Sequence, residues 1–268
     1  MTIYSAQDQV SNQRYIDING MLISNNATTP NTKIDVSAGL CGDVSNSFDI
    51  NLGNWYGSVP VPANANVVST IDATLNGALG LDQGSLAASK VYYVHVIFDI
   101  SGQLLPSVMI SLSKSAPLLP AGYSNFRWIG QMMTDSSSHF LLGYNSGQNR
   151  ERVWVYDAPQ ATSVTAGTSA TYAPIDLSAL VPNGIAQLPV LFRVNWTANA
   201  AGDTFNMQGV NATGDQWTLI APAAGGTAHT VGFGIVNAQI SSSLPKVNYK
   251  VSAVGGVAIN VAGFSYSL

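Results

Sequence analysis

The sequence predicts an all-β protein made of two β-sandwich or jelly-roll-like domains of short antiparallel strands. Apolar and polar residues alternate with a period of two in many short segments, as they do in half-buried strands. Turn-forming residues separate these segments, and the chain contains 25 Gly and 12 Pro. The acidic residues are almost all Asp, with Glu only at Glu151. Because Asp favours turns and caps whereas Glu favours helix interiors, long helices are not expected.

Predicted strands follow one another through both halves of the chain. In the first half, KVYYVHVIFDI (90–100) and PSVMISLS (106–113) flank a short loop at Ser101-Gly102, which predicts a hairpin. In the second half the same pattern predicts strands at 150–157, 188–198, 229–237, 246–252 and 257–268. Turn dipeptides such as Ala201-Gly202 and Gly255-Gly256 lie between them. Residues 71–80 are compatible with a short helix or with an irregular loop.

The segment SNFRWIGQMMTDSSSHFLLGY (124–144) gathers an Arg, a Trp, two Met, an Asp and a His, and so is either a catalytic cluster or a pair of strands. Every second residue faces the same side of a strand, and here these residues are Phe126, Trp128, Gly130 and Met132. The segment is therefore predicted to be a strand with one strongly apolar face. Asp135–Ser138 is a turn cluster, and residues 139–144 are predicted to run back as the partner strand. The segment is therefore interpreted as a hairpin, with His139 solvated after the turn.

The domain boundary is predicted from a change in composition. Residues 158–174 lose the large apolar side chains and become rich in Ala, Thr and Ser, as expected of a join between domains. We therefore predict an N-terminal β domain over 1–160 and a C-terminal β-sandwich or jelly-roll-like domain over 161–268. The polar, Asn-rich residues 1–30 are predicted to form an N-terminal arm.

The low charge content predicts that the protein works among other subunits. Only 9% of the residues are charged, against about 25% in typical globular proteins. A compact monomer of this mass exposes roughly 11,000 Å², so its charges would be sparse on the surface. A neutral β surface of this kind fits a chain that packs against copies of itself or against other proteins. The net charge of −4 gives no electrostatic reason to expect nucleic-acid binding.

The cysteine count and the hydropathy of the chain indicate in which compartment the protein is made. Cys41 stands alone, which excludes an intrachain disulfide and a multi-cysteine metal site and predicts a small buried residue. Residues 1–30 lack the basic and apolar regions of a signal peptide, and nowhere do 18 apolar residues run together. We therefore expect a soluble protein that is made in a cytosol and does not insert into a membrane.

The sequence predicts no catalytic, cofactor-binding or metal-binding residues, and hence no enzyme. Only His95, His139 and His229 are available as an imidazole base, and each is placed within or next to a predicted strand or turn. Neither a G-x-S-x-G nor a G-x-x-x-x-G-K-[ST] motif is present, and a glycosidase carboxylate pair would have to be built mainly from scattered Asp residues. The aromatic residues Trp55, Tyr56, Trp128, Trp154, Trp196 and Trp217 are able to stack on sugars, but packing is the favoured interpretation of each.

Three segments of the first half carry a resemblance to a known group of proteins. In the first, over 14–52, the matching residues are Ala38-Gly39, Asp43, Ser45-Asn46 and Asp49-Ile50. In the second, over 80–102, they are Gly80-Leu81-Asp82, Gly84 and Tyr92-Tyr93. In the third, over 116–144, they are Leu119-Pro120, Gly122-Tyr123, Arg127 and Ile129-Gly130. This succession resembles tailed-bacteriophage virion proteins of the tail-fibre type, although Gly42 stands where Arg is common and Val91 where Trp is common.

The resemblance covers about the first 145 residues, and its motifs are structural rather than catalytic. In the C-terminal half, the segment TYAPIDLSALVP and the closing segment VAGFSYSL are similar to jelly-roll-like caps on such proteins. What the resemblance implies is a symmetric virion subunit without a cofactor, assembled as a homotrimer or a higher ring.

Three hypotheses about function follow. The first is a non-enzymatic structural subunit of a tailed-phage virion, in a tail fibre or associated with the tail, whose partners are itself, other tail or capsid proteins and a host-surface glycan. The second is a capsid decoration, cement or head-fibre protein, and the third is a glycan-binding or glycan-depolymerising tailspike domain. The first two predict that the protein is localised in the virion.

Overall fold

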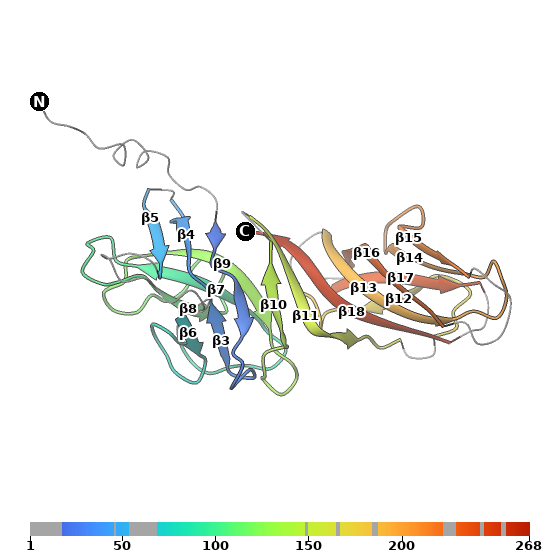
Figure 1. Ribbon diagram of the computed structural model, residues 1–268, viewed down its shortest axis with the longest axis horizontal. Coiled ribbons are helices and arrows are strands. Elements are labelled where there is room, and N and C mark those ends of the chain that lie inside the picture. Colours follow the sequence, from blue (N-terminus) through green and yellow to red (C-terminus); the bar gives the residue numbers. More distant parts are fainter. Residues whose placement is uncertain are drawn as a thin grey trace, which may run out of the picture. The chain divides into compact units, whose positions relative to one another are not determined.

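The prediction of an all-β protein is confirmed by the computed structural model (Figure 1). The structure describes residues 18–45, 47–53, 69–147, 150–164, 167–183, 187–221, 229–241, 244–252 and 256–268. Across these ranges the chain forms strands and turns and contains no helix. The strand pairs with a described register are antiparallel, and several antiparallel sheets of this kind are consistent with β-sandwich architecture.

The chain divides into two compact units. The first unit comprises Met1–Arg152 together with Ser267–Leu268, and the second comprises Val153–Tyr266. The chain therefore passes from the first unit to the second near the start of one strand, β11 (Glu151–Ala161). The sequence-based boundary at 160/161 falls at the end of that strand, and separate folding of the two domains stays a prediction.

Within its described residues, the first unit contains ten strands (Figure 1). They are β1 (Asn19–Gly20), β2 (Ile23–Asn25), β3 (Lys33–Val36), β4 (Gly39–Gly42), β5 (Asp49–Leu52), β6 (Ser69–Asp72), β7 (Val91–Phe98), β8 (Ser107–Ser111), β9 (Asn125–Met133) and β10 (Gly143–Ser146). Their orders are β1-β4-β5, β8-β7-β9 and β10-β2-β3-β6. Contacts of β6 with β8 and of β5 with β7 bring the three groups of strands around one core.

The core of the first unit follows from the alternation of its strands. Ile23, Ile34, Val36 and Ile71 are buried on one face of β2, β3 and β6, whereas their neighbours Ser24, Asp35 and Thr70 lie on the opposite face. In β7 the alternation gives way to burial on both faces over its last five residues. Burial on both faces is expected of a central strand, and β7 lies between β8 and β9.

The second unit contains the remaining strands. They are β12 (Ala173–Asp176), β13 (Gln187–Thr197), β14 (Thr204–Gly209), β15 (Trp217–Ile220), β16 (His229–Ser241), β17 (Leu244–Val251) and β18 (Val257–Ser267), together with most of β11. Their order is β15-β14-β17-β16-β13-β18-β11, and β12 also pairs with β17. Large apolar side chains fill the core of this unit, including Trp154, Trp196, Phe192, Phe205 and Phe264.

Most predicted strands are confirmed. The hairpin predicted from 90–100 and 106–113 is the antiparallel pair β7–β8, and the strands predicted in the second half correspond to β11, β13, β16, β17 and β18. Residues 71–80 end β6 and continue as a series of turns, so the irregular loop is the correct alternative. Residues 1–17 of the predicted N-terminal arm lie outside the described residues, and residues 18–30 include β1 and β2.

The hairpin predicted over 124–144 is only partly correct. The turn at Asp135–Ser138 is present, and a single antiparallel bridge joins Thr134 to Phe140. However, β9 pairs along its length with β7, and the returning segment pairs as β10 with β2. The physical reason is that β9 is buried on both faces from Trp128 onward, which requires a long apolar partner such as β7. The strand predicted with one strongly apolar face is thus buried on both faces over most of its length.

Candidate functional site

The motif residue Asp43 organises the loop after β4. Its carboxylate is fully buried and accepts hydrogen bonds from the backbone N–H groups of Ser47 at 2.5 Å and Phe48 at 2.9 Å, and from the hydroxyl of Ser45. Asn125 Nδ2 of β9 donates to the same carboxylate at 2.8 Å. Burial acts to raise the pKa of Asp43, but the hydrogen bonds from Ser45, Phe48 and Ser47 outweigh it, and the pKa lies below its ordinary value. The carboxylate is thus an ionised structural acceptor.

Arg127 joins this arrangement from the third motif segment. Its Nη1 donates to the backbone carbonyl of Asp43 at 3.3 Å, and Val44 N–H donates to the Phe126 carbonyl at 3.2 Å. The first and third motif segments therefore meet, although they are far apart in sequence. Asn46 lies outside the described residues.

Asp82, from the second motif segment, also holds loops in place in the first unit. Ser111 Oγ at the end of β8 donates to its carboxylate at 2.6 Å, and Leu118 N–H donates to the same oxygen at 3.3 Å. Tyr92 Oη accepts from Ala87 N–H at 2.8 Å and so closes the loop that leads into β7. Gly84 has a φ of +80°, in the left-handed region that favours glycine. The motif residues are used to fix loops.

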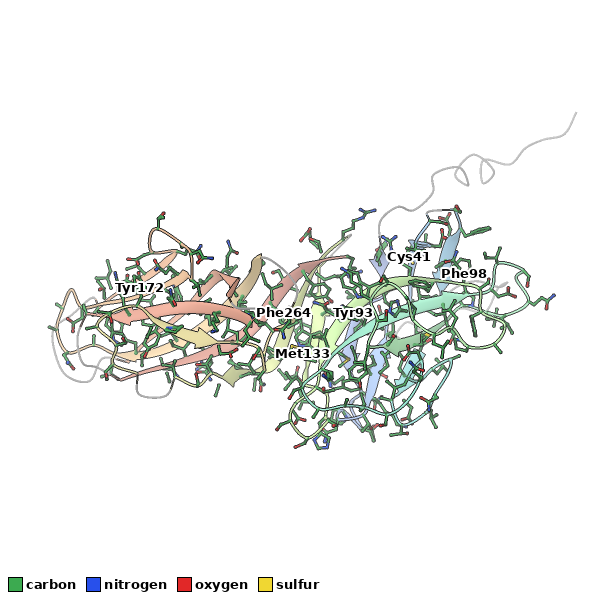
Figure 2. The ribbon with its side chains drawn as sticks, turned by 180° about the vertical axis from the view of Figure 1, so that it is seen from behind. Cys41, Tyr93, Phe98, Met133, Tyr172 and Phe264 are labelled. Atoms are coloured by element: carbon green, nitrogen blue, oxygen red, sulfur yellow. The ribbon has the colours of Figure 1, made fainter. Side chains whose placement is uncertain are left out.

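The histidines and the cysteine do not form a common site among the residues described. His95 is fully buried, its Nε2 lies 3.0 Å from the Ser113 carbonyl, and burial lowers its pKa to about 4, so the ring is neutral near pH 7. His139 is exposed, with Nδ1 3.8 Å from Asp135. His229 begins β16, and its side chain lies outside the described residues. Cys41, labelled in Figure 2, is buried, which raises its pKa to about 12.

The tryptophans within the described residues are used in packing. Trp154 and Trp196 lie in the core of the second unit. Trp128 is nearly buried, meets Tyr93 edge-on and has Lys114 Nζ 3.7 Å above its ring. Trp217 packs on the backbone of β16, where a side chain at Gly234 would collide with its ring. Trp55 and Tyr56 lie outside the described residues.

One sheet face of the first unit is polar, and sequence reasoning did not identify it. Tyr144 of β10 pairs with Ser24 of β2, Ser24 pairs with Asp35 of β3, and Asp35 pairs with Thr70 of β6. Because cross-strand partners project from the same face of a sheet, these four side chains form one row. The alternation of Lys33, Asp35 and Ser37 with Ile34 and Val36 marks this polar face in the sequence. The sequence does not reveal which strands lie beside it.

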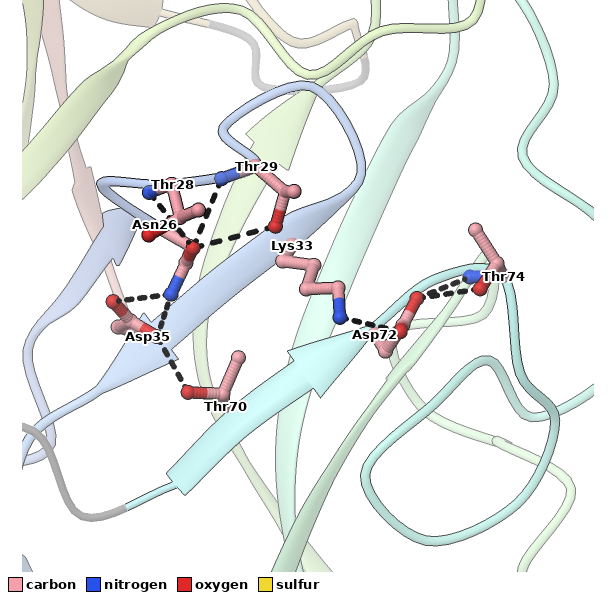
Figure 3. A network of polar contacts seen from close by, with 8 residues as sticks. All are labelled: Asn26, Thr28, Thr29, Lys33, Asp35, Thr70, Asp72 and Thr74. Carbon is pink, nitrogen blue, oxygen red and sulfur yellow. Dashed lines mark hydrogen bonds and ion pairs between the residues drawn. The ribbon is translucent and has the colours of Figure 1, made fainter.

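Hydrogen bonds hold Asp35 in one orientation on this face (Figure 3). Asn26 Nδ2 donates to its two oxygens at 3.0 and 3.1 Å, and Thr70 Oγ1 donates at 2.7 Å. Asn26 is itself fixed, because its Oδ1 accepts the backbone N–H groups of Thr28 and Thr29 at 3.0 Å each. Asp35 is 8% exposed, and these hydrogen bonds orient its carboxylate before any ligand arrives.

The neighbouring row on the same face carries an ion pair. Lys33 Nζ lies 2.8 Å from Asp72 Oδ2, and Thr74 donates to the same carboxylate (Figure 3). The hydrogen bond from Lys33, supported by those from Thr74, lowers the pKa of Asp72 to about 2. The charge of Lys33 is thus largely balanced by Asp72.

A groove of about 390 Å³ lies beside Asp35. It is lined by Leu22, Ile23, Ser24, Asp35, Ser37, Tyr144 and Asn145. Tyr144 is 45% exposed, whereas the small side chain of Ser24 leaves space between it and Asp35. Asn145 is fixed by accepting Ile23 N–H at 2.7 Å. The groove combines an exposed aromatic ring with hydroxyl and carboxylate groups, and we treat it as the candidate site.

A second surface feature of the first unit is apolar. Val44, Phe48, Ile100, Leu104 and Leu105 are exposed on loops near the end of β7, and we call them the apolar tip. Phe48 meets Phe98 with ring centroids 6.1 Å apart, and Ile100 N–H donates to Ser124 Oγ at 2.9 Å. Tyr123 Oη donates to the Leu105 carbonyl at 3.3 Å, so these loops are fastened to one another.

Among the described residues, no group of three or more His, Cys, Asp or Glu side chains is arranged to hold a metal ion. Within the same ranges, no helix has the length and apolar character needed to cross a membrane.

Comparison with known proteins identifies no family. No family model matches the chain, and no curated protein matches it. Among solved structures, the insecticidal delta-endotoxin Cry8Ea1 from Bacillus thuringiensis is similar at 9% identity and a TM-score of 0.21, over 94% of this chain and 52% of the toxin chain. Infectious bursal disease virus Gx strain is similar at 16% identity and a TM-score of 0.17, over 92% of this chain and 70% of the viral chain. This chain thus spans about half the length of the toxin chain.

Proposed function

We propose that the protein is a non-enzymatic structural subunit of a tailed-phage virion, in a tail fibre or associated with the tail, and that it acts as a homotrimer or a higher ring. The observation that carries the proposal is that the motif residues hold the loops of the first unit in place through hydrogen bonds. Asp43, Asp82 and Arg127 bind backbone groups and neighbouring polar side chains and thereby fix the loops of the first unit. These three belong to the residues on which the resemblance to virion proteins depends.

The surface of the first unit supports assembly as the mode of action. Leu105 is 68% exposed and Val44 is 56% exposed, and both belong to the apolar tip. Apolar side chains gathered on fixed loops are a common feature of protein–protein interfaces. Since only 9% of all residues are charged, little charge repulsion opposes the packing of neighbouring copies.

Native mass spectrometry of the purified chain tests the assembly. We expect a trimer or a higher ring at micromolar concentration, and we expect Leu105→Glu to shift the population toward monomer, because a charge would be buried at the interface. Ile220→Glu is the matched control, since Ile220 is similarly exposed, at 63%, on β15 of the second unit. A wild-type chain that stays a soluble monomer would overturn this part of the proposal.

Labelling of intact particles tests the location. Antibodies against the protein are expected to bind the tail in electron micrographs of the phage that encodes it. Labelling of the head would instead support the capsid decoration or head-fibre alternative. Absence of the protein from purified particles would contradict both.

A further inference from the structure

We infer that the polar groove of the first unit binds a neutral glycan, with Tyr144 as its stacking platform and Asp35 as its hydrogen-bond acceptor. The inference deepens the proposed virion role and rests on it only for the source of the glycan, a host surface. The groove itself is defined by strands β10, β2 and β3, which place Tyr144, Ser24 and Asp35 in one cross-strand row.

The row has the dimensions of a sugar site. Neighbouring strands lie about 4.8 Å apart, so Tyr144 and Asp35, which flank Ser24, are separated by roughly 10 Å across the sheet. The small hydroxyl of Ser24 forms the floor between them. A volume of about 390 Å³ lies within the range of small-molecule sites. One flat, ring-sized ligand therefore fits over Ser24.

The groups around the groove suit a polyhydroxylated ligand. An exposed tyrosine ring offers a rigid apolar face that loses little conformational entropy when it is covered. Asp35 is an acceptor held by three donor contacts, so it does not have to reorient in order to accept a sugar hydroxyl. Ser24 and Ser37 add hydroxyls that both donate and accept. Together they supply the mixed stacking and hydrogen bonding that a sugar ring uses.

Charge favours a neutral sugar over an acidic one or a phosphate. None of the lining residues is basic, and Asp35 places a carboxylate at the groove. Lys33, on the same face, is already paired with Asp72 at 2.8 Å. An acidic sugar would meet the Asp35 carboxylate without a compensating cation, which is unfavourable at short range. A single lining carboxylate also gives the groove less negative charge than a calcium site built from several carboxylates.

A printed array of neutral hexose and N-acetylhexosamine oligosaccharides, with sialylated and uronic-acid glycans beside them, tests the inference on the full chain. We expect the protein to bind one or more of the neutral glycans. We expect no binding that requires a sialic acid or a uronic acid. The best neutral oligosaccharide is then titrated calorimetrically into the wild type and the variants. Tyr144→Ala is expected to weaken binding roughly tenfold or more, since 1.4 kcal/mol of lost stacking corresponds to a factor of ten.

A second variant keeps the test independent of folding. Ser24→Phe fills the groove with a side chain that suits a strand, so the protein should fold but not bind. The matched controls are Ile220→Ala and Thr218→Phe on the exposed positions of β15, which should bind as the wild type does. Unchanged thermal unfolding temperatures confirm that the fold is retained.

The possible outcomes separate this inference from the proposed function. Absence of neutral-glycan binding by the wild type, or wild-type affinity in both groove variants, would overturn the glycan site and leave the virion role standing. Loss of assembly rather than of glycan binding in Tyr144→Ala would assign the groove to a protein partner and would also overturn it. Neutral-glycan binding by a protein absent from particles would retain the site and remove the virion role.

Discussion

Asn125 Nδ2 donates a hydrogen bond of 2.8 Å to the carboxylate of Asp43, a residue 82 positions earlier in the chain. This bond fastens the loop after β4 to the start of β9. The same loop carries Val44 and Phe48 of the apolar tip, so the Asp43–Asn125 pair fixes the geometry of that surface.

Replacing Asp43 should destabilise the first unit and disorder this loop. Asp43→Ala leaves the N–H groups of Ser45, Ser47 and Phe48 without their acceptor, and each hydrogen bond to a charged group contributes about 1.5–3 kcal/mol. We expect the free energy of unfolding to fall by at least about 2 kcal/mol in urea titrations. Asp157→Ala, at an exposed carboxylate, should change it little. Equal stability of both variants would contradict a structural role for Asp43.

The buried His95 should make the protein less stable in weak acid. Its folded pKa of about 4 lies below the ordinary value of 6.5, because burial disfavours the charged ring. Between these values the unfolded chain binds a proton that the folded chain does not, so the free energy of unfolding falls as the pH drops through this window. The full loss amounts to about 3 kcal/mol. It is checked by urea unfolding at a series of pH values from 7 to 4.5.

Two variants isolate the contribution of His95 from that of other groups. His95→Leu should flatten the slope of unfolding free energy against pH between 6.5 and 4.5, whereas His139→Gln, at an exposed position, should not. Asp72 acts at lower pH, because its pKa of about 2 means that its stabilising contribution is lost only as the pH falls below about 4. An unchanged slope in His95→Leu would contradict the buried neutral ring.

The strands could be predicted from the sequence because their signals are local. The apolar alternation of Leu188–Ala198 and Val257–Leu268 requires only neighbouring residues, and both segments are strands. The turn at Asp135–Ser138 was equally readable, since Asp135 Oδ1 accepts the N–H groups of Ser137 and His139 at 2.8 Å each. Asx-type turns of this kind are determined by a few adjacent residues, so they can be predicted from the sequence.

The pairing of the strands, and with it the candidate site, could not be predicted. Residues 139–144 looked like the partner of β9 because they follow it directly, but β9 pairs with β7. A bulge at Ile129, which has no partner between the pairs Val94–Gly130 and His95–Trp128, also shifts its register. Tyr144 and Asp35 reach one face only through the pairing of β10 with β2 and of β2 with β3. Such long-range pairing depends on the whole sheet.

The single cysteine should be unreactive in the folded protein. Burial raises the pKa of Cys41 to about 12, so almost none of it is thiolate at pH 8, and the thiolate is the reactive form. We expect negligible alkylation by iodoacetamide in buffer and complete modification of one thiol in concentrated urea, measured by intact-mass spectrometry. Labelling of the native protein at the rate of a free thiol would show that Cys41 is accessible.

In the second unit, Gly234 of β16 should tolerate no side chain. A Cβ at this position would lie 2.2 Å from the Trp217 ring, which packs directly on the glycine backbone. Gly234→Ala should therefore displace the ring and lower the free energy of unfolding by about 1–3 kcal/mol, the usual effect of overpacking. Gly214→Ala is the control, because nothing lies within 4 Å of its Cβ position. Tryptophan fluorescence and thermal unfolding report the two effects, and identical behaviour of the two variants would contradict the Trp217–Gly234 contact.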